Sequence, residues 1–278
     1  MKENGNWYEQ NWWQWWRGIQ QSPIYQRERG GWGQANPFYD RLSRYIPLII
    51  LAVLFFGLCG AVANSNNFYV WSNESAFLLW CLACLPGMLL SMVTLFGVFM
   101  APALTAPIVS MEVDRGSWDI LRLTPLPTRT ILAAKLLGAL ARLRIWLLLL
   151  LLTTLQGGIV TLAGLLYGQS MQLESWSLAV AIVFRPWLEI VFAAATGLYA
   201  SITVSSATTA LIAAYTAVIM MRLINSNPLW LLVGTLFELP TSQLFISINL
   251  GPTAVYTIIT GGLIWSIRRW ANTQDRGQ

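Results

Sequence analysis

The residues of this chain that can do chemistry are few, and their types exclude most catalytic sites. Histidine, which is the usual general base and the commonest metal ligand, is absent. The three cysteines, Cys59, Cys81 and Cys84, all lie in apolar runs. A C-L-A-C spacing without a second ligand pair predicts core packing and not a metal site. We therefore expect no catalytic residue and no metal ligand in this chain.

A nucleotide site is excluded on similar grounds. The sequence contains no G-x-x-x-x-G-K-[ST] segment, and its only lysines are Lys2 and Lys135. We expect this chain to hold no cofactor. If ATP and Mg²⁺ drive the protein, another chain must bind them.

The densest charge in the middle of the chain lies in the segment 111–138, between long apolar stretches. Ser117 is a good helix N-cap. The prolines Pro125 and Pro127 end the helix, because proline lacks an amide donor and restricts the residue before it. The sequence therefore predicts a short, exposed helix of two turns in a loop that faces the cytoplasm.

The charges of this helix are spaced to pair with one another. Asp119 lies four residues after Arg115 and three before Arg122. Such pairing would leave the apolar side chains of Trp118, Leu121 and Leu123 available for contact with a partner. A positively charged loop that only fixes the topology is the alternative.

Long apolar segments must position this loop. Hydrophobic residues make up 56% of the chain and charged residues only 10%, and several apolar runs approach the roughly 20 residues that cross a bilayer as a helix. We predict an all-α, polytopic membrane protein with six transmembrane helices, at 45–63, 76–98, 146–167, 176–204, 207–224 and 252–267. The interrupted apolar stretch 225–251 fits two half-length helices in the outer leaflet.

The basic residues fix the predicted orientation. Of the seventeen Lys and Arg residues, six precede the first span, six lie in or near 111–138 and three follow the last span. The positive-inside rule then places both termini and this loop on the cytoplasmic side of the plasma (cell inner) membrane. Because the rule explains the net charge of +5, we expect no nucleic-acid partner. Lys135, Arg142 and Arg144 are expected to snorkel at the inner boundary.

The N-terminal arm is rich in tryptophan. Trp12, Trp13, Trp15 and Trp16 crowd a polar segment, and tryptophan favours the headgroup region. We predict an interfacial helix that anchors the chain to membrane lipids. Packing against a partner subunit is the alternative.

Two ionisable residues lie within the fourth predicted span. Arg185 and Glu189 are four residues apart on one helical face. Charged groups at this depth are costly and often mark a transport pathway. A structural pair that neutralises itself near the outer boundary is the preferred alternative.

Two motifs resemble a known family. The spacings Glu112-x-Asp114-x-Gly116-Ser117 and Ile120-Leu121-Arg122-Leu123-Thr124-Pro125-Leu126 resemble the cytoplasmic loop between the second and third spans of type 2 ABC exporter permeases, and 21–29, QSPIYQRER, resembles their N-terminal connecting helix. The resemblance implies a coupling helix that docks on an ABC ATPase subunit holding ATP and Mg²⁺. It also implies a second permease copy or homologue, and helices between spans five and six. The implied coupling residues are Glu112, Asp114, Gly116, Ser117, Trp118, Asp119, Leu121, Arg122, Leu123 and Pro125.

These observations give three regions: a cytoplasmic arm and connecting helix at 1–44, a six-span domain at 45–270 and a cytoplasmic tail at 271–278. The expected function is that of a membrane-spanning exporter subunit that forms the translocation path, without enzymatic activity of its own. A membrane scaffold that keeps the fold but does not transport is the main alternative. A membrane-embedded enzyme is the weakest, because histidine and clustered intramembrane carboxylates are missing.

Overall fold

The computed structural model describes residues 12–31, 45, 47–53, 55, 74–124, 126–166 and 172–276. These residues form helices connected by short turns and contain no strand. Five of the helices are long and apolar enough to cross a membrane. The chain is therefore a multi-pass membrane protein of the all-α class.

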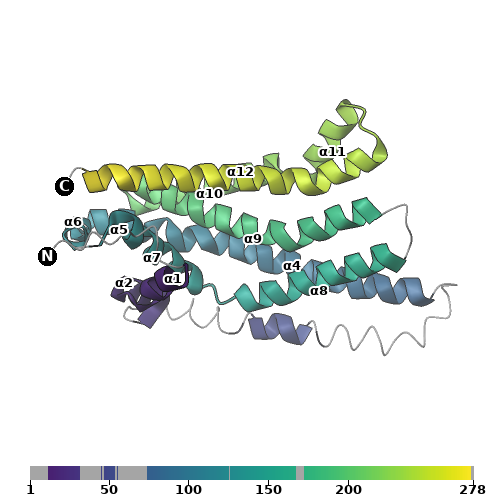
Figure 1. The fold of residues 1–278 in the computed structure, drawn as a ribbon, viewed down its shortest axis with the longest axis horizontal. Helices are drawn as coiled ribbons and strands as arrows, with labels where there is room; N and C mark the ends of the chain where they lie inside the picture. Colours follow the sequence, from purple (N-terminus) through teal and green to yellow (C-terminus); the bar gives the residue numbers. More distant parts are fainter. Residues whose placement is uncertain are drawn as a thin grey trace.

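The five long helices lie side by side as an elongated bundle (Figure 1). The bundle is built around α9, which packs against each of the other four. The long helices are α4 (Glu74–Thr105), α8 (Trp146–Leu166), α9 (Gln172–Thr203), α10 (Ala207–Ile224) and α12 (Thr241–Arg276). Side chains such as Val93, Leu149 and Ile190 are almost completely buried where α4, α8 and α9 meet.

Small residues allow a close contact between α4 and α9. Gly197 of α9 faces the C-terminal turn of α4, and a Cβ atom at this glycine would lie 3.2 Å from Pro102 Cα and 3.2 Å from Ala106 N. The neighbouring residues Ala194 and Ala195 are also buried. Such a surface lets two backbones approach closely, which is how membrane helices gain packing energy without a hydrophobic driving force between them.

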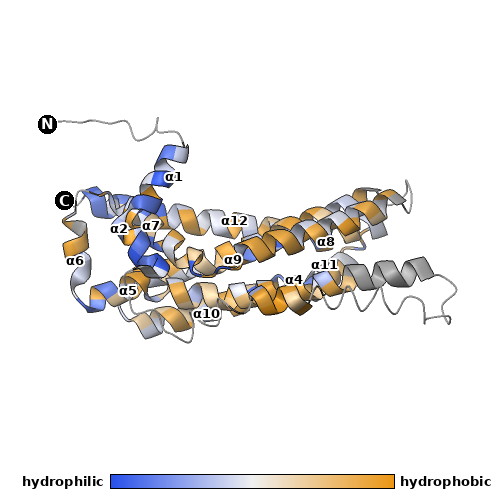
Figure 2. Ribbon diagram, turned by 90° about the horizontal axis from the view of Figure 1, so that it is seen from below, coloured by the Kyte–Doolittle hydropathy of each residue, from blue (hydrophilic) through white to orange (hydrophobic). Residues whose placement is uncertain are grey.

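The outer surface of the bundle is apolar along most of its length, and the hydrophilic residues gather at one end (Figure 2). Leu147, Ile212 and Ile258 are all more than half exposed on α8, α10 and α12. Lipid tails can cover such side chains, so their exposure is expected in a membrane protein.

The short helices divide between the two ends of the bundle. One end carries the C-terminal end of α12 together with the elements near the N-terminus, and α11 (Asn227–Leu236) lies toward the other end (Figure 1). The elements at the first end are α1 (Trp12–Gln21), α2 (Pro23–Gln26), the π-helix η1 (Arg27–Gly31), α5 (Pro107–Asp114), α6 (Ser117–Arg122) and α7 (Thr128–Ala141).

Most of the predicted spans agree with the observed helices. The third and fifth predicted spans, 146–167 and 207–224, correspond to α8 and α10 within one residue. The second predicted span is extended at both ends as α4, which continues through Pro102. The first predicted span, 45–63, falls largely outside the described residues.

The segment between the fifth and sixth predicted spans differs from expectation. α11 forms, but the expected second half-helix and the expected last span are one continuous helix, α12, with Pro252 inside it. The Pro252 carbonyl oxygen accepts a hydrogen bond from Asn225 Nδ2 at 2.8 Å. α12 also continues through the predicted tail as far as Arg276. A proline in a helix flanked by packed neighbours removes one hydrogen bond without ending the helix.

Candidate functional site

The helix predicted in the segment 111–138 is present as α6, and it lies across the end of the bundle (Figure 2). The chain turns sharply between α5 and α6 at Gly116, whose φ is 68°. Glycine adopts this left-handed conformation without the penalty that a Cβ atom imposes. At the other end, Thr124 Oγ1 donates a hydrogen bond of 2.7 Å to the Leu121 carbonyl oxygen. Pro125 lies outside the described residues.

The predicted role of Ser117 as the N-cap was wrong. Gly116 occupies the N-cap position, and Ser117 is the first residue of α6. The Ser117 hydroxyl donates to Glu112 Oε2 at 3.0 Å. The sharp turn at Gly116 brings the hydroxyl back to the last turns of α5, where a carboxylate accepts its hydrogen bond.

Trp118 was expected on the exposed face of α6, and this expectation was wrong. Its side chain is 7% exposed and packs against Trp270 of α12, with ring centroids 6.3 Å apart. Leu121, three residues later, is half-buried in the same hydrophobic cluster. Spacing of three residues places both side chains on the face of α6 that is turned toward the bundle.

The exposed apolar face of α6 consists of Ile120 and Leu123, which we call the docking face. Their exposed fractions are 69% and 84%. Sequence reasoning identified Leu123 but missed Ile120. The signal was available, since Ile120 and Leu123 are also three residues apart and must lie opposite Trp118 and Leu121.

Charged residues lie close in sequence to the docking face. Asp114, Arg115 and Asp119 are exposed. Arg115 and Asp119 form no ion pair with each other in this described part of the chain, so both remain available to solvent or to a partner. The side chain of Arg122 lies outside the described residues.

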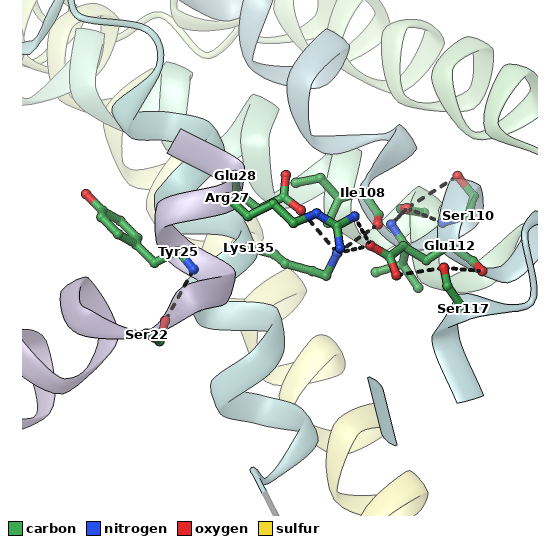
Figure 3. A network of polar contacts seen from close by, with 11 residues as sticks. Ser22, Tyr25, Arg27, Glu28, Ile108, Ser110, Glu112, Ser117 and Lys135 are labelled. Carbon is green, nitrogen blue, oxygen red and sulfur yellow. Dashed lines mark hydrogen bonds and ion pairs between the residues drawn. The ribbon is translucent and has the colours of Figure 1, made fainter. Parts of the chain in front are cut away.

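Behind α6, four charged side chains from three elements form an ion cluster (Figure 3), which we call the buried ion cluster because Glu112 and Lys135 at its centre are buried, whereas Arg27 is more than half exposed. Lys135 Nζ of α7 lies 2.8 Å from Glu112 Oε1 of α5 and 3.2 Å from Glu28 Oε1 of η1. Arg27 of η1 donates to the same Glu112 oxygen at 2.8 Å. The formal charges of these four residues cancel, which is the condition under which charge is tolerated in a protein interior.

The positions of Glu112 and Lys135 correct two predictions. Glu112 was expected in the surface that contacts a partner, but the residue is only 5% exposed. Lys135 was expected to snorkel at the inner boundary, but it is 1% exposed and is the largest fully buried side chain among the residues that the structure describes. Glu112 and Lys135 are 23 residues apart, so no local spacing rule links them.

The N-terminus of α5 is bound by a side chain of α9, the central helix of the bundle. Ser201 Oγ of α9 accepts hydrogen bonds from Val109 N at 2.9 Å and from Ser110 N at 3.0 Å. The first amides of a helix have no partner within the helix, and α5 has no capping side chain of its own. Ser201 therefore fixes the start of α5 to α9.

The N-terminus of α7 is bound in a similar way by the last helix. Thr128 N and Thr128 Oγ1 both donate to Asp275 Oδ1, the first at 3.0 Å. A carboxylate at a helix N-terminus also interacts favourably with the helix dipole. The residue predicted to lie in a polar tail thus joins the end of α12 to the segment 111–138.

The tryptophan-rich arm forms α1, which is attached to the same end of the bundle. Ile19 is 2% exposed and, with Tyr25 of α2, packs against Ala134 of α7. Trp13 is 68% exposed, whereas Trp15 and Trp16 are half-buried. The side chain of Trp12 lies outside the described residues. Contact of this helix with lipid stays a prediction.

Arg185 and Glu189 lie on α9, away from the segment 111–138. Arg185 Nε lies 2.9 Å from Glu189 Oε1, and Arg185 NH1 donates to Asn227 Oδ1 at 2.7 Å. The ion pair therefore also joins α9 to the first residue of α11. Both ionisable groups have partners, as charges within a span require.

The described residues include no group of three or more His, Cys, Asp or Glu side chains placed to hold a metal ion. The end of the bundle that carries α6 combines an exposed apolar face with polar contacts that join α5 to α7 and α9, and α7 to α12.

Comparison with known proteins identifies the family. The family model described as ABC-2 family transporter protein matches residues 19–271. A search of curated proteins and a search of solved structures gave no match. The match includes η1, the segment 111–138, four of the long helices in full and α12 as far as residue 271. ABC-2 permeases in general work with an ABC ATPase component. The chain belongs to the ABC-2 transporter family, as a permease-type membrane component of an ABC transporter.

Proposed function

We propose that this chain is the membrane-spanning subunit of an exporter, and that α6 is its contact with a separate ABC ATPase subunit. The ATPase subunit would bind ATP and Mg²⁺, and two membrane subunits, identical or homologous, would form the translocation path between them. The export direction follows from the resemblance of the segments 21–29 and 111–138 to type 2 exporter permeases.

The observation that carries this proposal is the two-sided character of α6. Trp118 and Leu121 hold one face against the bundle, while Ile120 and Leu123 expose the other face at 69% and 84%. Apolar anchors surrounded by charged residues are typical of the energetic centre of a protein interface. Asp114, Arg115 and Asp119 supply such a rim.

Three sets of polar contacts would carry a displacement of α6 to the rest of the bundle. The buried ion cluster joins α5 to α7 and η1 through Glu112 and Lys135. The hydrogen bonds of Ser201 join α5 to α9, and those of Asp275 join α7 to α12. Because charged and hydrogen-bonded buried contacts resist separation, the elements at this end would move together when an ATPase displaces α6.

The proposed orientation places α6 and both termini in the cytoplasm. α1 and the C-terminal end of α12 lie at the same end of the bundle as α6 (Figure 1). Fifteen of the seventeen Lys and Arg residues precede the first predicted span, lie in or near 111–138, or follow the last span. The positive-inside rule then assigns this end to the cytoplasmic side of the cell inner membrane.

The test replaces both anchors of the docking face, as Ile120→Ala with Leu123→Ala. The readout is the amount of ATPase subunit that copurifies in detergent and the ATP hydrolysis of the purified complex. Truncation of two interface anchors costs about 1–2 kcal/mol each. The two losses add to about 2–4 kcal/mol, so we expect the affinity for the ATPase to fall by roughly 30- to 800-fold.

The matched control is Leu236→Ala with Phe237→Ala, which truncates two exposed apolar residues, 73% and 74% exposed, at and just after the end of α11. The control should retain the ATPase. Equal retention by both double variants would exclude α6 as the contact. Absence of any nucleotide-binding chain from the native complex would support the scaffold alternative.

A further inference from the structure

Arg222, in the last turn of α10, is a cation without a hydrogen-bonded partner in the described part of the chain. Its NH1 atom is buried and has no acceptor, and the ion pairs among the described residues do not include it. A guanidinium stays charged and carries five N–H donors. Burying such a group in a membrane bundle without an acceptor is costly, and ionisable residues of this kind mark functional sites.

The topology of the chain does not explain the charge of Arg222. Fifteen of the seventeen Lys and Arg residues lie in segments that the positive-inside rule assigns to the cytoplasmic side, and the other two are Arg185 and Arg222. Arg185 is held by protein groups, since its Nε lies 2.9 Å from Glu189 Oε1 and its NH1 donates to Asn227 Oδ1 at 2.7 Å. Arg222 has no such partner among the described residues.

Hydrogen bonds fix the turn that follows Arg222. Asn225 Nδ2 donates to the Pro252 carbonyl oxygen of α12 at 2.8 Å. Asn225 Oδ1 accepts a hydrogen bond of 2.8 Å from Trp230 Nε1 of α11. Because Asn225 is only three residues after Arg222, these bonds hold the end of α10 against α11 and α12.

The charged residues of this region leave one positive charge without compensation. Tyr256 of α12, one turn after Pro252, is buried and interacts electrostatically with Arg222. Arg185 and Glu189 interact with the same tyrosine, so the three charged groups share one part of the bundle. Glu189 is already paired with Arg185. The three formal charges therefore sum to +1, and this excess is the charge of Arg222.

The exposed surface next to Arg222 is apolar. Leu223 and Ile224 are 62% and 57% exposed, and Ile219 and Met220, in the preceding turn, are 44% and 53% exposed. An alkyl chain can cover these side chains, whereas they offer no hydrogen bond to a water-soluble anion. A ligand that matches both surfaces has an anionic head and an apolar tail.

We propose that Arg222 binds the anionic head of an amphiphilic molecule, a phosphate or a carboxylate, whose tail lies along the exposed face of α10. A guanidinium donates two parallel hydrogen bonds to such a group. Arg222 as a whole is half-buried, so a ligand on the surface of α10 can reach it. The bound head would neutralise the excess charge where α10 meets α9 and α12. Binding at this position needs neither α6 nor an ATPase subunit.

The head and the tail of the ligand can be tested separately. The full chain, with any subunits that copurify, is prepared in dodecyl maltoside. Dodecyl phosphate supplies an anionic head with a tail, inorganic phosphate supplies the head alone, and additional dodecyl maltoside supplies the tail with a neutral head. Thermal unfolding gives the midpoint temperature with each probe, and a titration gives the dissociation constant of dodecyl phosphate.

Dodecyl phosphate should raise the midpoint of the native chain by about 3 °C at tenfold excess over its dissociation constant, and the other two probes should not. Arg222→Gln should weaken the binding of dodecyl phosphate by about 10- to 100-fold, because a charge-assisted contact is lost. Without ligand, the midpoint of Arg222→Gln should equal or exceed that of the native chain, since an uncompensated charge is no longer buried. Arg222→Lys keeps the charge and should retain part of the affinity.

The matched control is Arg268→Gln, which removes one exposed cation from α12. It should bind dodecyl phosphate as the native chain does. Equal weakening by both Gln variants would show attraction by net charge alone and overturn the proposal. A full temperature shift with inorganic phosphate would overturn it too, because the tail would then have no part in binding.

The ligand-free midpoint of Arg222→Gln distinguishes a binding role from a structural one. If Arg222 holds the bundle together, this variant should unfold at a clearly lower temperature than the native chain, and that result would also overturn the proposal. None of these readouts depends on ATP hydrolysis, so the binding site and the proposed ATPase contact are tested separately.

Discussion

Lys135 Nζ lies 2.8 Å from Glu112 Oε1, and both residues are almost completely buried where α7 meets α5. The pair holds α6 indirectly, because Glu112 also accepts the hydroxyl hydrogen bond of Ser117 at the start of α6. A buried pair of this kind is weak evidence for stability by itself. Its value to the protein lies in fixing the relative positions of three elements at the end of the bundle.

The first prediction concerns the loss of one member of this pair. Lys135→Met should lower the free energy of unfolding by about 3 kcal/mol, because it leaves Glu112 buried with only the partly exposed Arg27 as a cationic partner. Glu112→Leu should have an effect of the same sign. The measurement is chemical denaturation of the purified chain in detergent.

The double variant Glu112→Leu with Lys135→Met serves as the test of mechanism. Removing both charges leaves no unpaired ion between α5 and α7, so the loss of stability should be clearly smaller than the sum of the two single losses. Strictly additive losses would mean that the two side chains do not interact energetically. Separately, reduced ATP hydrolysis in a stable double variant would show that the pair helps to transmit movement from α6 to the bundle.

The second prediction concerns the contact between α4 and α9. In Gly197→Ala, the new Cβ atom would collide with Thr105 Oγ1 and lie 3.2 Å from backbone atoms of Pro102 and Ala106. Backbone atoms cannot move away as a flexible side chain can, so we expect a loss of about 1–3 kcal/mol in the free energy of unfolding. Denaturation in detergent measures it.

Gly261→Ala provides the control, because nothing lies within 4 Å of a Cβ atom at this position of α12. This substitution should be neutral or stabilise the helix by up to about 1 kcal/mol, since alanine has the higher helix propensity. If the two variants unfold at the same denaturant concentration, the close approach of α4 and α9 is not a determinant of stability.

The third prediction separates the two interpretations of Arg185 and Glu189. If they form a structural pair, losing one member should cost more stability than losing both. Arg185→Gln should lower the free energy of unfolding, because Glu189 loses its partner and Asn227 of α11 loses a donor. The double variant Arg185→Gln with Glu189→Gln should recover much of the stability, since two amides can hydrogen-bond without charge.

Activity of the double variant decides the outcome. A structural pair predicts native ATP hydrolysis and transport once stability is restored. A double variant that is as stable as the native chain but no longer transports would instead place Arg185 and Glu189 in the translocation path. The measurement requires reconstitution with the ATPase subunit in liposomes.

Much of the architecture is present in the sequence because burial in a bilayer imposes simple rules. Apolar runs of the required length give α8 and α10 within a residue of the predicted limits. Gly116 and the residues that follow it predict a turn and a short helix. These features depend only on residues that are close in sequence, so the amino-acid sequence alone predicts them.

Three-dimensional contacts decide the features that the sequence misplaced. Trp118 is turned inward because Trp270 of α12 fills the space beside it, and Lys135 is buried because Glu112 and Glu28 neutralise it. Pro252 stays within α12, where it is buried against neighbouring elements, although a proline in isolation predicts a break.

The sequence alone determined where several long apolar helices lie and where a short helix interrupts them, because length, hydropathy and turn residues act locally. The tertiary structure decided which face of α6 is exposed and which charges are buried. Burial and pairing depend on partners far away in the chain, such as Glu112 and Lys135, 23 residues apart. The free energy of a buried charge is set by the atoms around it and not by its neighbours in sequence.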